Sequence, residues 1–229
     1  KKINMKITFF MLFIANTAFS QTDALGIISN DANYSRVINQ NNLVDKKNEV
    51  KIEGSPYLFN EYNLSKIGDY KDEINIKYNI FSDEVEFVKN GQLLALNKTP
   101  DLSKIRFINY NTILVLKEIN GNNGYYLELF NNNGRQLLKK LKIRLEKGRT
   151  SQNSYDLDRN SRYIEDEPIY YFFIENNLIA SNKLKKIEGD LEKKGYNIKE
   201  ILKKEKLSIK KDQDLIKLIN LILNIRNLS

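Results

Sequence analysis

Oxygen-bearing side chains and lysines are the candidates for chemistry in this sequence, because it contains no histidine and no cysteine. Nucleophilic catalysis by Ser-His-Asp or Cys-His groups is therefore excluded, and zinc sites, which rely on those two residues, are disfavoured. Carboxylates, lysine and tyrosine remain available as acids or bases, and oxygen ligands remain available for Ca²⁺ or Mg²⁺. The chain has no glycine-rich phosphate loop, and we expect no cofactor.

One acidic segment has the spacing of a calcium-binding loop. Its oxygen-bearing residues, at relative positions 1, 3, 5 and 12, are Asp156, Asp158, Asn160 and Glu167. Two features depart from the calcium pattern: Ser161 stands where the loop needs glycine, and a strand is expected after Pro168. The alternative interpretation is a polar connector between strands, and these departures favour it.

Glu84 and Glu86 form a second candidate, since they flank Val85 in a predicted strand. Side chains alternate along a strand, so the two carboxylates share one face. Paired carboxylates can cleave a glycosidic bond by acid–base catalysis. The chain has no tryptophan to stack on a sugar ring, and we expect an exposed strand face instead.

Tyrosines gather in the strand-rich part of the chain, and Tyr57 and Tyr78 are candidate binding residues. Tyrosine serves carbohydrate and peptide recognition well. It also packs well on a pleated surface. Core and cross-strand packing is therefore the favoured alternative for these rings.

A basic tail follows, with eleven lysines against five acids in residues 183–211. Its candidate binding residues are Lys185, Lys186, Lys193, Lys194, Lys203 and Lys204. Such a segment can neutralise phosphates or an anionic membrane surface, but it lacks the arginines and interleaved aromatic rings typical of nucleic-acid binding. We expect no nucleic-acid partner. A solvated helical face is favoured over contact with an envelope glycan, lipid or protein.

The beginning of the chain has the features of a secretory signal peptide. Met5 and Lys6 precede an uncharged, apolar run, and Ala18 and Ser20 supply small residues before a cut in front of Gln21. The apolar run has about twelve residues, whereas a membrane span needs about 20. We expect residues 1–20 to be removed, the mature chain to hold no transmembrane segment, and the protein to reach the periplasm, the outer cell surface or the medium.

The elements that position these residues are mostly strands. From residue 51 apolar and polar residues alternate, and Asn90-Gly91 marks a hairpin because both turn residues must take positive φ. One long strand is expected at 136–145. After a polar leader at 21–50, the pattern predicts a curved antiparallel β-meander, an open barrel-like sheet, at 51–182.

A helical period replaces the alternation after Ser181. A first helix is expected to end at Gly195, a second covers about 198–202, and a third runs from Asp212 to about 227. The apolar stripe of the third helix is too wide for a helix lying loosely in solvent, so it docks on the sheet or on a partner. The fold class is therefore α+β, with two or three C-terminal helices at 183–229.

Two stretches resemble a group of exported Bacteroidota proteins. These proteins carry a G-S-P-Y-L opening, present here at 54–58, and a Y-N-x-[FY]-x-D-E-[IVL]-E strand, present at 78–86. The Lys-rich segment 203–218 is similar to their helical ending. The group has no assigned function, so the resemblance implies an architecture and export, and no activity or catalytic residue.

These features favour a non-enzymatic cell-envelope protein that binds a glycan, lipid or protein surface. One alternative is a carboxylate-dependent hydrolase acting on envelope polysaccharide, which would need a groove with two carboxylates of raised pKa. A second is a structural or assembly subunit, which would need the apolar face at 215–223 to be exposed in the monomer.

Overall fold

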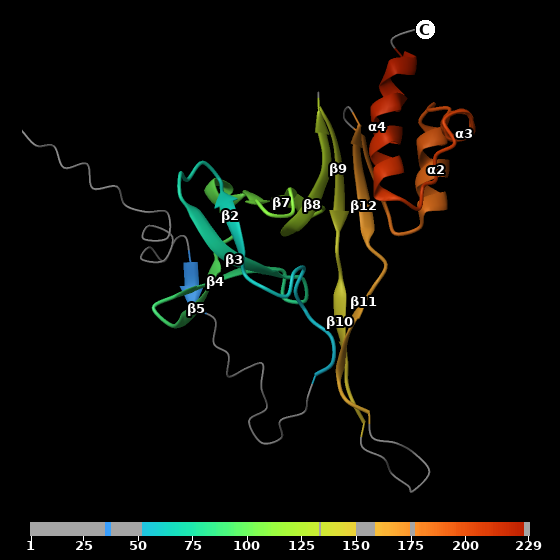
Figure 1. The fold of residues 1–229 in the computed structure, drawn as a ribbon. Coiled ribbons are helices and arrows are strands. Elements are labelled where there is room, and N and C mark those ends of the chain that lie inside the picture. The colour runs from blue at the N-terminus through green and yellow to red at the C-terminus, as the bar shows by residue number, and fades with distance from the viewer. Residues whose placement is uncertain (1–34, 38–51, 133, 150–158, 175–176, 227–229) are drawn as a thin grey trace, which may run out of the picture.

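The computed structural model describes residues 35–37, 52–132, 134–149, 159–174 and 177–226. Ten strands form one antiparallel sheet that is not closed, the short strand β1 adds to one edge, and three helices follow the sheet (Figure 1). The predicted α+β class, with an open antiparallel sheet and C-terminal helices, is confirmed.

After the edge strand β1, the chain continues at β2, in the middle of the sheet. In spatial order the strands are β1 (Ser35–Val37), β5 (Gln92–Leu96), β4 (Glu84–Lys89), β3 (Glu73–Asn79), β2 (Asn63–Ile67), β6 (Lys104–Phe107), β7 (Thr112–Ile119), β8 (Asn122–Asn132), β9 (Arg135–Lys140), β12 (Ile169–Ile174) and β13 (Asn177–Ser181). From β2 the chain runs outward to β5, returns through the 3₁₀ turn η2 (Pro100–Leu102), and pairs β6 with the other edge of β2. The sheet is therefore two meanders that share β2.

Two positions show why glycine is required at turns. The predicted hairpin between β4 and β5 is confirmed, with φ of 50° at Asn90 and 74° at Gly91. Gly68, after β2, has φ of 52°, and a Cβ there would lie 2.1 Å from the carbonyl oxygen of Asp101. Only glycine allows the two backbone segments to approach this closely.

A two-stranded ribbon leaves the sheet between β9 and β12 and projects away from it (Figure 1). It consists of β10 (Ile143–Glu146), β11 (Arg162–Glu165) and the flanking described residues 147–149 and 159–161. The prediction of one long strand at 136–145 is wrong, because β9 pairs with β8 and β12 whereas β10 pairs with β11. The chain changes partners at Leu141 and Lys142.

Two large apolar cores and a smaller cluster, which includes Tyr126 and Leu138, hold the fold together. The first lies under the curved part of the sheet, from β2 to β8, and includes Tyr78, Phe87, Phe107 and Tyr125 among its fully buried side chains. The second lies between the helices and the strands β9, β12 and β13. Its buried members from both sides are Leu137, Tyr170, Phe172, Ile174, Ile179, Ile187, Leu191, Leu215, Leu218, Ile219 and Ile222.

The helices α2 (Leu184–Lys193), α3 (Ile198–Lys204) and α4 (Asp212–Arg226) form a layer on this second core (Figure 1). As predicted, Gly195 follows the first helix, with φ of 86°. Asp212 joins α4 to the sheet, since its carboxylate accepts hydrogen bonds of 2.7 Å from both Lys139 and Tyr170. No helix within the described ranges is long and apolar enough to cross a membrane.

Candidate functional site

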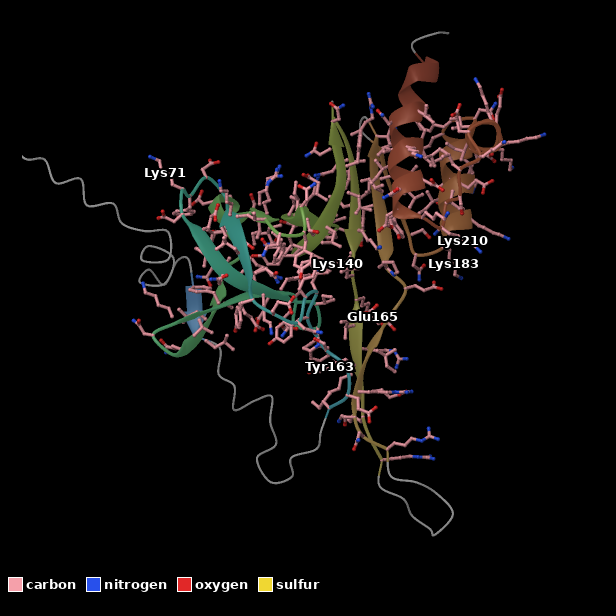
Figure 2. All side chains as sticks on the ribbon, in the orientation of Figure 1. Lys71, Lys140, Tyr163, Glu165, Lys183 and Lys210 are labelled. Carbon is pink, nitrogen blue, oxygen red and sulfur yellow. The ribbon has the colours of Figure 1, made fainter. Side chains whose placement is uncertain are left out.

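The six candidate lysines of the basic tail are all exposed on α2, α3 and the residue after α2. Lys193 lies 3.7 Å from Asp190 on the same helix, and Lys194 donates a hydrogen bond to Asn177 at 2.7 Å. Figure 2 shows Lys183 and Lys210 at the lower end of the helical layer. Exposed lysines with local partners are typical of a solvated face.

The described half of the predicted calcium loop does not form a cation site. Asp156 and Asp158 lie outside the described residues. Asn160 and Glu167 stand on either side of the extended strand β11, in which each residue adds about 3.3 Å. Two ligands of one calcium ion, each about 2.4 Å from it, cannot be separated by a four-residue strand. Asn160 instead donates a hydrogen bond to Glu53 at 3.0 Å.

Tyr78 is a core residue, with 2% of its surface exposed, and therefore does not present its ring to a ligand. Its hydroxyl donates a hydrogen bond of 2.7 Å to Asp83, in the turn between β3 and β4. The Asp83 carboxylate also accepts bonds of 2.7 Å from Lys98 and from Lys140. Figure 2 shows Lys140 where the curved part of the sheet meets β9. We call Tyr78, Asp83, Lys98 and Lys140 the Asp83 cluster.

Backbone geometry adapts to the Asp83 cluster. Asp83 has φ of 57°, a left-handed conformation that is uncommon outside glycine. A Cβ at Gly124 would lie 2.8 Å from its carboxylate, so glycine makes room for the cluster against β8. Burial alone would raise the pKa of Asp83, but the charge and hydrogen bonds of Lys140, with hydrogen bonds from Lys98 and Tyr78, outweigh it and lower that pKa. Asp83 is thus an ionised link between the β3–β4 turn and β9.

Glu86 is buried, with 3% of its surface exposed, and the prediction of an exposed face for it is wrong. Residues 56–58 pair with the end of β3 through an antiparallel bridge between Tyr57 and Asn79, so the Tyr57 side chain lies on the same face as that of Asn79. The Glu86 carboxylate accepts hydrogen bonds from Tyr57 at 3.0 Å and from Asn79 at 2.8 Å. Burial, followed by the charge of Glu86, raises the pKa of Tyr57.

A third carboxylate, Glu128, has a side chain that is only 6% exposed. It accepts a hydrogen bond of 2.7 Å from Gln136 and lies 3.5 Å from Lys104. Asp83, Glu86 and Glu128 accept hydrogen bonds from different donors, and no bond that the structure describes joins two of these carboxylates.

The ring of Tyr57 has other neighbours besides Glu86. It lies under the ammonium group of Lys77, 4.4 Å from the ring centroid, and it also lines a cavity of about 270 Å³ at the root of the ribbon. The other lining residues are Leu58, Ile80, Lys139, Leu141, Lys142, Ile143, Glu165, Asp166 and Pro168. Of the two candidate tyrosines, only Tyr57 thus lines a cavity among the described residues.

A charged groove on the ribbon is the candidate binding site, and it was missed by reading the sequence for paired acids and lysines. Its volume is about 450 Å³, and its lining residues are Glu53, Glu146, Lys147, Arg149, Arg159, Asn160 and Arg162. A signal for it exists in the sequence: four of the eight arginines of the chain lie between residues 144 and 162. Arginine is the residue suited to fork-shaped recognition of anions.

Three backbone segments build this ribbon groove. Arg149 and Arg159 stand directly opposite each other and exchange backbone hydrogen bonds of 3.0 and 2.9 Å. Glu53 adds as a third segment beside β11, with its N–H bonded to Ser161 and its carbonyl to Tyr163, both at 2.9 Å. The groove therefore rests on hydrogen-bonded backbone from both sides of the ribbon.

Acids in the groove are held by neighbouring donors. Arg162 donates a hydrogen bond of 2.6 Å to Glu146, and this bond lowers the pKa of the Glu146 carboxyl. Asn160 donates to Glu53. The described lining has four cationic side chains and two carboxylates, an excess of two positive charges. Such a lining can bind an anion.

Comparison of the chain with protein-family models, with curated proteins and with solved structures finds no match.

Proposed function

We propose that this protein is an exported, non-enzymatic binding protein of the cell envelope, and that the ribbon carries its ligand site. The observation that carries the proposal is the charged groove of about 450 Å³, whose described lining residues are all charged or polar. The ribbon projects away from the sheet (Figure 1), and the lining residues Glu53, Arg159 and Arg162 are exposed. Arginine side chains that converge on a concave surface suit an anionic ligand.

Export is supported by the sequence alone. Residues 1–20, which lie outside the described residues, have the charged start, short apolar run and small-residue cleavage pattern of a signal peptide. A protein that folds without cysteine suits either side of a bacterial membrane, since its stability does not depend on disulfides.

The two alternatives receive less support. A hydrolase needs a carboxylic acid that is protonated at neutral pH beside a second carboxylate, whereas the pKa of Asp83 is lowered and Glu86 is bonded to Tyr57 and Asn79. An assembly subunit needs an exposed apolar face on α4. Among the described residues of that face, Leu215, Leu218, Ile219 and Ile222 are buried in the second core.

The test is co-sedimentation of the chain from residue 21 onward with three materials: isolated envelope polysaccharide, vesicles of neutral phospholipid, and vesicles containing phosphatidic acid. We expect saturable retention on an anionic material that weakens between low and high salt, without release of reducing sugar ends. Release of reducing ends in proportion to protein concentration would establish the hydrolase instead. Absence of retention on every material would refute the binding function.

The helices must stay in the chain used for this test. A chain ending before α2 would uncover Leu137, Phe172 and the rest of the second core. Loss of binding by such a truncated chain would then report unfolding rather than the position of the ligand site. Substitutions of exposed charges avoid this ambiguity.

A further inference from the structure

We propose that the cavity of about 270 Å³ at the root of the ribbon binds a free amino acid with an apolar side chain. We call it the root cavity. This inference goes beyond the proposed function, because it concerns a second site and does not depend on the ribbon groove. One juxtaposition carries it: apolar side chains and exposed charges of both signs line the same cavity.

Hydrogen-bonded backbone forms two walls of the root cavity. The chain changes strand partners at Leu141 and Lys142, so the ribbon diverges there from the rest of the sheet. On the ribbon side, the N–H of Asp166 donates a bond of 2.9 Å to the carbonyl of Lys142. On the sheet side, the N–H of Ile80 donates a bond of 2.8 Å to the carbonyl of Pro56. The cavity therefore lies between two segments that backbone hydrogen bonds hold in place.

Some charged side chains of the root cavity are already paired with other residues. Lys139 and Asp166 lie 2.7 and 3.0 Å from partners outside the described lining. Lys142 and Glu165 differ, since both are exposed and neither side chain forms an ion pair or a hydrogen bond with a described residue. Figure 2 shows Glu165 at the end of the ribbon that adjoins the sheet. Within the described lining, Lys142 and Glu165 are therefore the charges that a ligand can engage.

Lys142 and Glu165 stand close enough to hold one small ligand. Glu165 pairs directly with Ile143, the residue after Lys142. Opposed residues of an antiparallel pair have Cα atoms about 4.5–5.5 Å apart, and one step along a strand adds about 3.3 Å. A ligand with an ammonium and a carboxylate group on one carbon atom can therefore bind Glu165 with the first and Lys142 with the second. Amino acids carry both groups ionised at neutral pH, so both hydrogen bonds are charge-assisted.

The apolar part of the lining selects the side chain of the ligand. Leu58, Ile80, Leu141 and Ile143 contribute aliphatic groups, and the ring of Tyr57 adds an aromatic surface. Burial of an apolar side chain against these groups favours binding. A water molecule takes about 30 Å³ in the liquid, so the cavity has room for about nine groups of that size, about the number of non-hydrogen atoms in leucine.

The experiment is titration calorimetry of the chain from residue 21 onward with leucine, leucine amide, isocaproate and glycine. Leucine amide lacks the carboxylate, isocaproate lacks the ammonium group, and glycine lacks the apolar side chain. We expect saturable binding of leucine. Leucine amide and isocaproate should each bind at least about tenfold more weakly, or about 1.4 kcal/mol, because each loses one charge-assisted hydrogen bond. Glycine should also bind more weakly, because it buries no apolar side chain.

Two variants assign each charged group of the ligand to its residue. Lys142→Gln should weaken leucine binding at least about tenfold, and should change the affinity for leucine amide by less than about twofold, since the amide has no carboxylate. Glu165→Gln should weaken leucine binding equally and leave the affinity for isocaproate within about twofold, since isocaproate has no ammonium group. Both residues are exposed, so these substitutions should not unfold the chain.

Matched controls remove the same charges elsewhere. Lys71→Gln and Glu205→Gln alter exposed residues, and Lys71 lies far from Glu165 (Figure 2). Leucine affinity should stay within about twofold of the unsubstituted chain in both, because solvent and salt screen distant charges.

Each contrary outcome overturns a defined part of the inference. Absence of saturable leucine binding overturns the site, while retention of envelope material would still support the proposed function. Binding of isocaproate or leucine amide as tight as that of leucine overturns the choice of an amino acid. Losses in the control variants equal to those in Lys142→Gln and Glu165→Gln overturn the position of the site.

Discussion

Replacing Asp83 by asparagine removes one charge from the Asp83 cluster and changes little else. Asparagine has the shape of aspartate and tolerates the left-handed conformation that Asp83 adopts, with φ of 57°. Its side-chain oxygen can still accept the hydrogen bond from Tyr78. What disappears is the negative charge that faces Lys98 and Lys140, each 2.7 Å away.

The expected cost follows from the partial burial of the three charges. Breaking a fully buried ion pair costs about 3–5 kcal/mol, whereas an exposed pair is worth about 0–1 kcal/mol. The side chains of Asp83, Lys98 and Lys140 are 23%, 29% and 23% exposed. We therefore expect Asp83→Asn to lower the free energy of unfolding by about 2–3 kcal/mol at neutral pH, between the two limits.

The dependence of this loss on pH identifies its cause. The pKa of Asp83 is lowered in the folded protein below its ordinary value of 3.8. Its stabilisation is therefore fully present above 3.8 and disappears as the pH falls through the lower, folded pKa. The unfolding free energies of the unsubstituted chain and of Asp83→Asn should converge in that acidic range.

Urea unfolding followed by circular dichroism at several pH values measures both effects. Asp101→Asn is the matched control, since Asp101 is an exposed residue of η2 and its substitution should change stability by less than about 0.5 kcal/mol. If Asp83→Asn lowers the unfolding free energy no more than the control does, the stabilising role of the Asp83 cluster is refuted. A loss that persists unchanged at acidic pH would also refute it, since it would not come from ionised Asp83.

Two further predictions concern a close backbone approach and two tyrosine hydroxyl groups. Gly68→Ala should lower the unfolding free energy by about 2 kcal/mol or more, because the added Cβ would clash with the backbone of Asp101. Gly121 also has positive φ, but a Cβ there would have no atom within 4 Å. In the same urea experiment, Gly121→Ala should therefore lower the unfolding free energy by less. The buried Tyr125 hydroxyl has no hydrogen-bond partner among the described residues, so Tyr125→Phe should leave stability unchanged or raise it by about 1 kcal/mol. Tyr170→Phe, which removes a bond to Asp212, should instead lower stability by about 1–3 kcal/mol; equal effects of the two phenylalanine variants would contradict this account.

The sequence predicted those parts of the fold that local chemistry decides. The Asn90-Gly91 hairpin, the helix end at Gly195 and the start of α4 at Asp212 each depend on residues within a few positions of one another. Strands with alternating apolar residues were predictable for the same reason. The pairing of β2 with β6 was not, since no local pattern reveals which distant edge a strand will meet.

Burial of the carboxylates could not be predicted from strand alternation. Glu86 lies on the face opposite Val85, as expected, but the segment around Tyr57 pairs with the end of β3, and its tyrosine becomes a donor to the buried carboxylate. The ribbon groove likewise depends on Glu53 joining Arg162 from far away in the sequence. The available signal was the concentration of arginines at 144–162. Counting arginines separately from lysines along the chain would have revealed it.

The shared strand β2 sets the order in which the molecule can fold. The meander from β2 to β5 consists of neighbouring hairpins, whose short loops close at low entropic cost. The two meanders join where Ser65 of β2 pairs with Phe107 of β6. The strands β3, β4 and β5 lie between these two residues in the sequence. Contacts between distant residues slow folding. We therefore expect the β2–β5 half to form first, and the open edge of β2 to be the template on which β6 begins the second half.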